Sequence, residues 1–246
     1  MRFGILGLGR FGQCWAKLMI PFGSVVAYDP LWNSSPLESV TLVSLEEVFL
    51  AEIVFFLVPI SSFRECCQKV ARHVAPSTLL VDACSVKIFP LQIMRETFSP
   101  EQPLMSLHPL FGPDSIKTIE DARGQKIILC TKNKEKLAQK MRSIFKSLGL
   151  ETIFLSPQKH DAQMAQTQAL AHFLGRIPML RAKNEKITTP SFELLNKMVA
   201  SVMQDREELF LDMHCYNPFA RGAREKFLAE LLVLHKSLAR IFHTES

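Results

Sequence analysis

The chain has 246 residues, 48% of them hydrophobic, and a formal net charge of +5. This length allows one large or two small domains, and the apolar content is that of a globular protein with a proper core. No apolar run is long enough to cross a bilayer, and no basic run or basic–aromatic platform indicates nucleic-acid binding. The positive charge suits small anionic ligands, such as a dinucleotide and a dicarboxylate.

The six cysteines show neither a disulfide framework nor a metal-binding pattern. They stand at positions 14, 66, 67, 84, 130 and 215, with no Cys-X-X-Cys pair and no His/Cys spacing typical of zinc. We therefore expect reduced thiols, no metal and a cytoplasmic location. The apolar N-terminus is interrupted by Arg2, Arg10 and three glycines, which favours a first strand and turn over a signal peptide.

In the first 155 residues, short apolar segments alternate with amphipathic ones. Helices are expected between strands that cover residues 2–6, 24–28, 42–43, 53–58, 78–81, 104–107, 126–131 and 151–155. Ser44 and Glu47 form a capping-box pattern, and Ser61 or Ser62 is expected to cap the helix after the 53–58 strand. The alternation predicts an α/β fold with a doubly wound parallel sheet, a Rossmann domain that covers residues 1–155.

The pattern changes near residue 156, and no strand alternation returns. Amphipathic helices are expected over residues 161–174, 192–203, 206–213 and 220–241. They predict a smaller, all-helical domain over residues 156–246 that holds the substrate. A helical domain of this size buries only part of its Leu, Met and Phe side chains by itself, so we expect a homodimer formed through this half.

A Gly-Leu-Gly-Arg-Phe-Gly pattern at residues 7–12 follows the first strand and opens the first helix. Such glycines permit a tight turn, a close approach of a pyrophosphate to the backbone, and close packing of the helix. Asp29 ends the second strand, where a carboxylate can bind both ribose hydroxyls and repel a 2′-phosphate. NAD is therefore predicted, with NADP as the alternative. The expected cofactor contacts are Gly7, Gly9, Arg10, Phe11, Gly12, Asp29, Val58 and Pro59.

Val58 and Pro59 end the fourth expected strand, at the edge where cofactors lie in such sheets, although simple strand termination explains them equally well. Ser85 and Lys87 follow the next strand, and His108 follows the strand after that. Because the carboxyl ends of parallel strands share one edge, these side chains are expected in a single cleft.

A neutral His108 beside a nicotinamide can accept a hydroxyl proton while hydride leaves the substrate. The turn at Gly112 leaves room for that substrate. In the helical half, His172 is placed three turns after Asp161 on the expected 161–174 helix, and Gln168 precedes it by about one turn on the same face. Polar capping of an interdomain cleft is the alternative explanation for this second set.

Together, the Gly-Leu-Gly-Arg-Phe-Gly, Ser-Val-Lys, His-Pro-Leu-Phe-Gly-Pro and Gln-Ala-Leu-Ala-His-Phe blocks resemble the prephenate/arogenate dehydrogenase family along most of the chain. The Phe-Gly-Pro-Asp-Ser, Phe-Glu-Leu-Leu and Tyr-Asn-Pro segments look most like the plant-type arogenate branch. The resemblance implies oxidative decarboxylation of arogenate or prephenate in tyrosine biosynthesis. It also implies that His108 polarises the ring hydroxyl, that Ser85 assists His108, and that His172 helps to bind substrate.

One departure from the family pattern bears on the substrate. Many prephenate enzymes carry an arginine before the final Asn-Pro segment that holds a substrate carboxylate, whereas Ala200 or Ser201 stands there in this chain. Arg176 or Lys87 could replace that arginine. The plant-type branch also lacks it, which favours arogenate. No mutase-like extension is present, so a monofunctional enzyme is expected.

Two other functions remain open at this point. One is an NAD-binding regulator of the same family without catalysis, which would require His108 to lie away from the nicotinamide. The other is a different Rossmann reductase, such as a β-hydroxyacid dehydrogenase, in which Lys197 would imitate a catalytic lysine of the helical domain. That family does not explain the His-Pro-Leu-Phe-Gly-Pro block.

Overall fold

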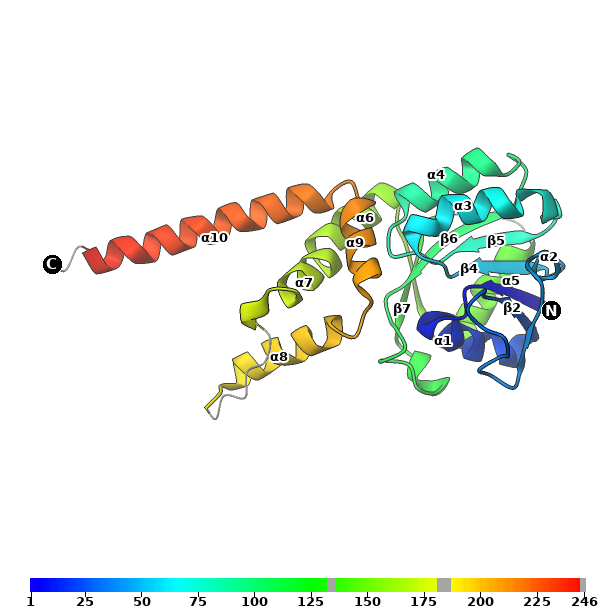
Figure 1. The fold of residues 1–246 in the computed structure, drawn as a ribbon, viewed down its shortest axis with the longest axis horizontal. Helices are drawn as coiled ribbons and strands as arrows, with labels where there is room; N and C mark the ends of the chain where they lie inside the picture. Colours follow the sequence, from blue (N-terminus) through cyan, green and yellow to red (C-terminus); the bar gives the residue numbers. More distant parts are fainter. Residues whose placement is uncertain (132–135, 181–186, 244–246) are drawn as a thin grey trace. The chain divides into compact units, whose positions relative to one another are not determined.

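The computed structural model describes residues 1–131, 136–180 and 187–243. It divides into two compact units, Met1–His160 and Asp161–Ser246 (Figure 1). The division lies within helix α6 (Pro157–Gln166), slightly beyond the predicted boundary after residue 155. Each unit is described by itself.

The first unit is built on one eight-stranded sheet, in the order β3-β2-β1-β4-β5-β6-β7-β8. The chain moves outward from β1 in one direction and then, after β3, in the other. Such a reversal is the topological switch point of a doubly wound fold, so the predicted α/β class is confirmed. The strands are β1 (Arg2–Leu6), β2 (Ser24–Tyr28), β3 (Val40–Leu42), β4 (Ile53–Phe56), β5 (Leu79–Asp82), β6 (Leu104–Pro109), β7 (Lys126–Leu129) and β8 (Glu151–Phe154).

Two strands, β7 and its parallel neighbour β8, depart from the predicted all-parallel arrangement. β7 runs antiparallel to β6, with Leu107 opposite Leu129 and Pro109 opposite Ile127. The connection between these strands carries only the short helix η3 (Glu120–Ala122), whereas a parallel return would require a full crossover helix. The pairing also extends β6 through His108, which was predicted to follow the strand.

Helices cover both faces of this sheet. Phe55 of β4 packs edge to face on Trp15, with ring centroids 5.4 Å apart, while its neighbour Phe56 packs on Phe63 at 5.5 Å. Adjacent strand residues point to opposite faces, so the helices that carry Trp15 and Phe63 lie on opposite sides of the sheet. α4 lies beside α3 (Figure 1). The helices are α1 (Arg10–Met19), α2 (Leu45–Val48), α3 (Ile60–Val70), α4 (Ile88–Thr97) and α5 (Lys136–Ser147).

The predicted capping box is confirmed. Ser44 and Glu47 exchange side-chain and backbone hydrogen bonds at the start of α2. The predicted serine cap of the next helix is wrong, because α3 begins at Ile60, directly after Pro59. The φ of Pro59, −54°, is already near the helical value, so the helix can start immediately after it.

The turn between β1 and α1 requires glycine at two positions. Gly7 has a φ of +93°, and a β carbon there would lie 2.5 Å from the carbonyl oxygen of Leu57. A β carbon at Gly12 would lie 2.1 Å from the carbonyl oxygen of Gly7. A β carbon at Gly9 would meet no heavy atom within 4 Å. The turn is therefore tightly packed at its first and third glycines and open at its second.

An ion pair without solvent exposure joins the end of β5 to β6. Lys87 Nζ lies 2.6 Å from Asp82 Oδ2, and both side chains are 0% exposed. The same ammonium donates to the carbonyl oxygen of Leu107 at 2.6 Å. Asp82 also accepts hydrogen bonds from the hydroxyl of Ser106 and the backbone N–H of Cys84. These bonds fix the segment that leads into His108.

The second unit is helical throughout its described residues. It contains the end of α6, followed by α7 (Gln168–Gly175), η4 (Pro178–Leu180), α8 (Pro190–Val202), α9 (Glu207–Cys215) and α10 (Ala220–His243). None of the described helices, α10 included, combines the length and apolar character needed to cross a bilayer.

The predicted continuous helix over residues 161–174 is wrong. α6 ends at Gln166, α7 begins at Gln168, and Thr167 between them has a φ of −117° and a ψ of −81°. The Thr167 hydroxyl donates to the carbonyl oxygen of Gln163 at 2.8 Å, a local bond that competes with regular helix geometry. His172 therefore does not share a helix face with Asp161.

Replacing Lys87 by methionine should destabilise the fold strongly, because it leaves the Asp82 carboxylate buried without its cation. Breaking a buried ion pair from one side costs about 3–5 kcal/mol. Urea denaturation should show this loss, and adding Asp82→Asn should recover part of it. The control, Lys69→Met, removes the exposed pair with Glu65 and should cost about 1 kcal/mol or less. Equal losses in the two single variants would contradict the role assigned to the buried pair.

Alanine at Gly12 should affect stability, whereas alanine at Gly9 should affect cofactor binding. Gly12→Ala should lower the melting temperature, because the new methyl group must displace the Gly7 carbonyl, and overpacking costs about 1–3 kcal/mol. Gly9→Ala should melt like the unmodified protein but bind the predicted NAD more weakly, since its methyl group fills the open space above the turn. Thermal unfolding and NAD titration measure both effects. Equal melting of the two variants would show that the turn is not packed as described.

Candidate active site

Several segments that follow strands converge at the carboxyl edge of the sheet in the first unit. The glycine turn follows β1, residues 57–59 follow β4, and residues 83–87 follow β5. Asp82, the last residue of β5, pairs with Ser106, so His108 lies beyond the end of β5 on the longer strand β6. This edge, beside the switch point, is where ligands bind in open α/β sheets.

The glycine turn has the features of a pyrophosphate site. The space over Gly9 is open, and α1 begins at Arg10 without a side-chain cap on its first turn. The first N–H groups of a helix have no partners within the helix and favour an anion. The structure therefore leaves room and donors for a phosphate where the sequence predicts one.

Asp29 occupies the predicted ribose position at the end of β2, and it also supports the turn. Its Oδ2 accepts the backbone N–H of Leu8 at 2.7 Å, and its Oδ1 accepts that of Leu31 at 2.9 Å. Each carboxylate oxygen can accept a further hydrogen bond. The ribose contact remains a prediction for this residue.

The other predicted cofactor residues surround the turn. Arg10 is exposed and forms an ion pair with Asp114 at 2.8 Å, which links the turn to the segment after His108. Phe11 stacks on Trp15, with ring centroids 5.9 Å apart. The remaining two contacts lie in the segment before α3: Val58, whose methyl group approaches Gly7, and the exposed Pro59.

His108 forms a buried pair with a second histidine. Its Nδ1 lies 2.8 Å from Nε2 of His160, and the rings meet edge to face with centroids 5.0 Å apart. His108 is 5% exposed and His160 0%. Burial, together with His160 and the Lys87 ammonium, holds the pKa of His108 well below its usual 6.5. His108 is therefore neutral at physiological pH and able to accept a proton.

His160 was not among the predicted site residues. The available signal was the His-Asp pair at residues 160–161, just after the last strand. A helix pattern alone does not show that such a residue reaches across to β6. Only the position of α6 against the sheet brings the two imidazoles together.

The two residues predicted beside His108 behave differently from expectation. The hydroxyl of Ser85 is buried without a hydrogen-bond partner, so the expected bond to His108 is absent from this structure. The Lys87 side chain has no exposed surface, and its ammonium binds Asp82 and the Leu107 carbonyl, so the structure does not support the substrate contact predicted for it. Gly112 has open space where its β carbon would be, which agrees with room for a ligand.

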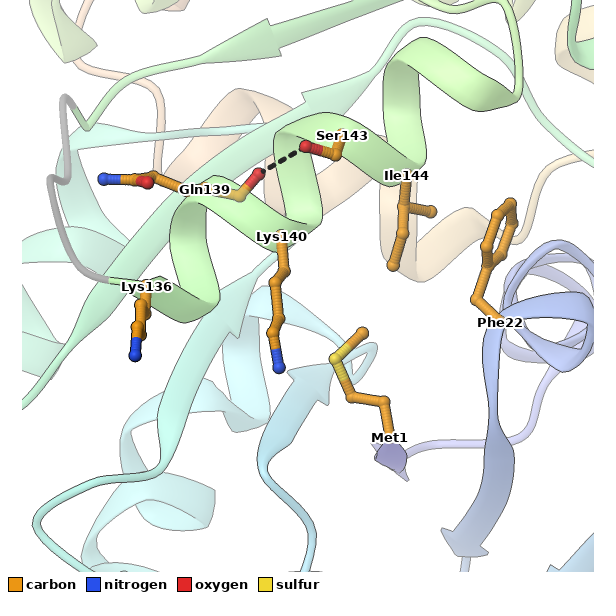
Figure 2. A pocket seen from close by; sticks show the side chains of 7 residues that line it. All are labelled: Met1, Phe22, Lys136, Gln139, Lys140, Ser143 and Ile144. Carbon is orange, nitrogen blue, oxygen red and sulfur yellow. Dashed lines mark hydrogen bonds between the residues drawn. The ribbon is translucent and has the colours of Figure 1, made fainter.

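Two hollows lie in the first unit, and the larger one begins at Arg10 of the glycine turn. The larger, of about 670 Å³, runs along α1 from Arg10 to Ile20 and faces the 113–120 segment. The smaller, of about 400 Å³, lies between α5 and the two residues Met1 and Phe22 (Figure 2). Met1 precedes β1, so this smaller hollow is at the amino edge of the sheet, away from His108.

The second unit has a polar cluster of its own. His172 is buried, and its Nε2 lies 3.6 Å from Oδ2 of Asp205. Arg176 donates to the carbonyl oxygen of Asp205 at 3.1 Å, and its guanidinium lies 5.1 Å from the ring centroid of Phe210. Burial lowers the pKa of His172, Asp205 opposes that shift, and Arg176 adds to it. Asp205 was not predicted, because a lone acid between two helices carries no sequence signal.

Three predicted residues of this unit have polar atoms that are buried and unpartnered. They are Oε1 of Gln168, Nδ1 of His172 and Nε of Arg176. Buried polar atoms are nearly always satisfied in native structures, so each orphan requires an explanation, and an absent ligand is one.

Comparisons with known proteins agree with these features. Residues 39–153 match the family model described as prephenate dehydrogenase, nucleotide-binding domain. Residues 177–246 match the model described as TYRAAT1-like, C-terminal domain.

Two curated relatives are 26% identical to this chain. Arogenate dehydrogenase 1, chloroplastic, from Arabidopsis thaliana aligns with 100% of the chain and 40% of its own length. The probable arogenate/prephenate dehydrogenase of Methanocaldococcus jannaschii aligns with 75% of the chain and 43% of its own length. The chain therefore spans less than half the length of these two relatives.

A solved structure shares the fold. Prephenate dehydrogenase from A. aeolicus, in complex with hydroxyphenyl propionate and NAD⁺, superimposes with a TM-score of 0.72 and 19% identity, over 98% of this chain and 91% of the other. The chain is thus similar to prephenate and arogenate dehydrogenases in its sequence blocks, its matched nucleotide-binding domain and its curated relatives, and it shares the fold of a prephenate dehydrogenase.

Proposed function

We propose that this protein is an NAD(P)-dependent dehydrogenase that converts arogenate to tyrosine, or prephenate to 4-hydroxyphenylpyruvate, by oxidative decarboxylation. The observation that carries the proposal is His108, a buried and neutral imidazole at the carboxyl edge of the sheet. It lies in the same unit as an open glycine turn suited to a dinucleotide.

The residues of the first unit fit a nicotinamide dinucleotide. The turn of residues 7–12 would hold the pyrophosphate, and Asp29 would hold the ribose. A carboxylate at that position favours NAD over NADP, because it repels a 2′-phosphate, and no arginine follows at residues 31–33. When bound, the cofactor supplies a hydride acceptor.

His108 would polarise the substrate. Its neutral ring accepts a hydrogen bond from the ring hydroxyl and becomes more positive as hydride leaves the carbon that carries this hydroxyl. The carbon–carboxylate bond then breaks, CO₂ departs, and its electron pair completes the aromatic ring. Aromatisation supplies the driving force, so the protein mainly has to orient and polarise the substrate.

The cluster of the second unit supports an amino-acid substrate. Arg176 offers a guanidinium held by Phe210 and by the Asp205 backbone, and it is our candidate for the missing carboxylate-binding arginine. The Asp205 side chain is partly exposed beside His172 and would attract the ammonium group of arogenate. Prephenate has a keto group there and gains nothing from a carboxylate. Gln168 and His172 would supply further hydrogen bonds to the side chain of the substrate.

The helical unit also supports a homodimer. α10 carries large apolar side chains that are 45–68% exposed, an arrangement that usually marks an interface. They are Leu228, Leu231, Leu232, Val233, Leu234 and Leu238. Light scattering at micromolar concentration measures the oligomeric state, and a monomer would exclude this arrangement.

The cytoplasmic location stays a prediction, and the Arabidopsis relative named above is chloroplastic.

No specific observation favours the alternatives of a non-catalytic regulator or a β-hydroxyacid dehydrogenase. The direct test is an assay at 340 nm of the purified protein with each pair of NAD or NADP and arogenate or prephenate. Turnover of neither substrate with either cofactor would refute the proposed function. Turnover with NADP alone would remove the role assigned to Asp29.

His108→Asn should lower kcat by roughly 10²-fold or more, because it keeps the local shape and removes the base. NAD affinity should barely change. In the unmodified protein the neutral imidazole is the competent form, so activity rises with pH through the pKa of His108. Because that pKa is lowered well below 6.5, activity should already be at its plateau at neutral pH and fall only in acid. The control is His73→Asn, at a partly exposed histidine after α3 and outside the candidate site. Wild-type turnover in the His108 variant would place the chemistry elsewhere.

Asp205→Asn should shift the preference from arogenate toward prephenate. We expect the kcat/KM for arogenate to fall by roughly 10-fold or more, the size of one charge-assisted hydrogen bond, while that for prephenate holds or rises. The control is Glu207→Gln, which removes a neighbouring acid from the first turn of α9. The role of Asp205 in recognition is refuted if the ratio of the two kcat/KM values does not move.

A further inference from the structure

The contact between His108 and His160 constrains where protons can lie. The two nitrogens, Nδ1 of His108 and Nε2 of His160, are 2.8 Å apart. A hydrogen bond between two imidazole nitrogens needs one N–H donor and one bare acceptor. Each arrangement of that proton fixes what the other nitrogen of His108 can do.

Only one arrangement serves a base. If Nδ1 of His108 donates, its Nε2 is bare and can accept the hydrogen bond of a substrate hydroxyl. If Nδ1 of His108 accepts, then Nε2 carries the hydrogen of the neutral ring and cannot accept. The partner of Nδ1 therefore decides whether His108 is competent.

No other side chain in the described structure takes this place. Ser85, the residue expected to assist, has a buried hydroxyl without any hydrogen-bond partner. The ammonium of Lys87 is held by Asp82 and the Leu107 carbonyl, and it carries no acceptor. His160 meets the ring of His108 directly, at hydrogen-bond distance and with complete burial.

Both members of the pair are held by regular structure. His108 lies within β6, where it pairs with Ile128 of β7. His160 lies in α6, where its N–H donates to the carbonyl oxygen of Ser156 at 2.9 Å. Rigid backbone on both sides keeps the rings in one relative orientation, which a positioning contact requires.

We propose that His160 is the positioning residue of this site: its Nε2 accepts the Nδ1–H of His108, and so presents a bare Nε2 of His108 to the substrate hydroxyl. The proposal rests on the proposed dehydrogenase function for its kinetic consequences. Its structural content, the tautomer of His108, does not depend on that function.

The same bond supports the charged state that develops during the reaction. When His108 takes up the substrate proton at Nε2 as hydride leaves, both of its nitrogens carry hydrogen, until the proton returns to the phenolate oxygen formed by the loss of CO₂. The Nδ1–H then donates to a neutral His160, and a hydrogen bond from a charged donor is about twice as strong as a neutral one. His160 thus stabilises the reacting His108 without touching the substrate.

Two variants of His160 separate this role from simple packing. His160→Gln places an amide oxygen near the position of Nε2 and keeps an acceptor, whereas His160→Leu fills similar space without one. We expect kcat to fall by roughly 10²-fold or more in the leucine variant, the scale of lost acid–base assistance, and by about 10-fold or less in the glutamine variant. The control is Lys159→Gln, at the exposed neighbour of His160 on α6.

The tautomer is measured directly by long-range ¹H–¹⁵N correlation spectra of the histidine rings at neutral pH. We expect the Nδ1 resonance of His108 to be of the protonated type and its Nε2 resonance of the bare type. His160→Leu should shift His108 toward the opposite tautomer, while His160→Gln and Ser85→Ala should leave it unchanged.

The outcomes distinguish the two proposals. If the unmodified protein turns over neither substrate, the proposed function fails, and the spectra still test the tautomer. If it is active, but His160→Leu retains wild-type turnover, the positioning role fails alone. A hydrogen on Nε2 of His108 in the unmodified protein would also overturn it. If the leucine variant does not fold, the spectra of the unmodified protein and of the glutamine variant decide.

Discussion

The ion pair between Lys87 and Asp82 ties together the parts of this fold on which the candidate site depends. Two opposite charges without solvent exposure are stable only when each is paired and hydrogen-bonded, and both conditions hold here. The ammonium reaches the Leu107 carbonyl, one residue before His108, while the carboxylate holds Ser106. The end of β5 and the end of β6 are thereby locked in one register.

The antiparallel return of β7 has a related consequence. β6 continues past its parallel neighbour because β7 supplies partners for Leu107, His108 and Pro109. A histidine in a loop would sample many orientations, whereas a histidine inside a paired strand has a fixed backbone. The extended strand presents His108 to α6, whose His160 then becomes its partner. Strand pairing therefore orients the proposed base, whereas the sequence pattern predicted that His108 lies after the end of the strand.

The second unit contributes a different kind of chemistry. Charged and hydrogen-bonding groups meet there: His172 and Arg176 stand on and at the end of α7, and Asp205 lies between α8 and α9. Buried polar atoms without partners within the described structure are Nδ1 of His172, Nε of Arg176 and Oε1 of Gln168. In the first unit the polar groups near His108 are mostly satisfied by one another, apart from the Ser85 hydroxyl. The two units therefore differ in how far their buried polar groups are satisfied by one another.

Local sequence patterns determined the features that depend on near neighbours: the alternating strands and helices, the glycine turn, the Ser44 capping box and the helical second half. Backbone sterics and hydrophobic periodicity act over a few residues and can be read along the chain. Tertiary structure alone decided that Lys87 is buried with Asp82 rather than free for substrate, that β7 is antiparallel, and that His160 rather than Ser85 bonds His108. These outcomes depend on contacts between segments that are far apart in sequence. Such segments come into contact only when the helices and strands pack together.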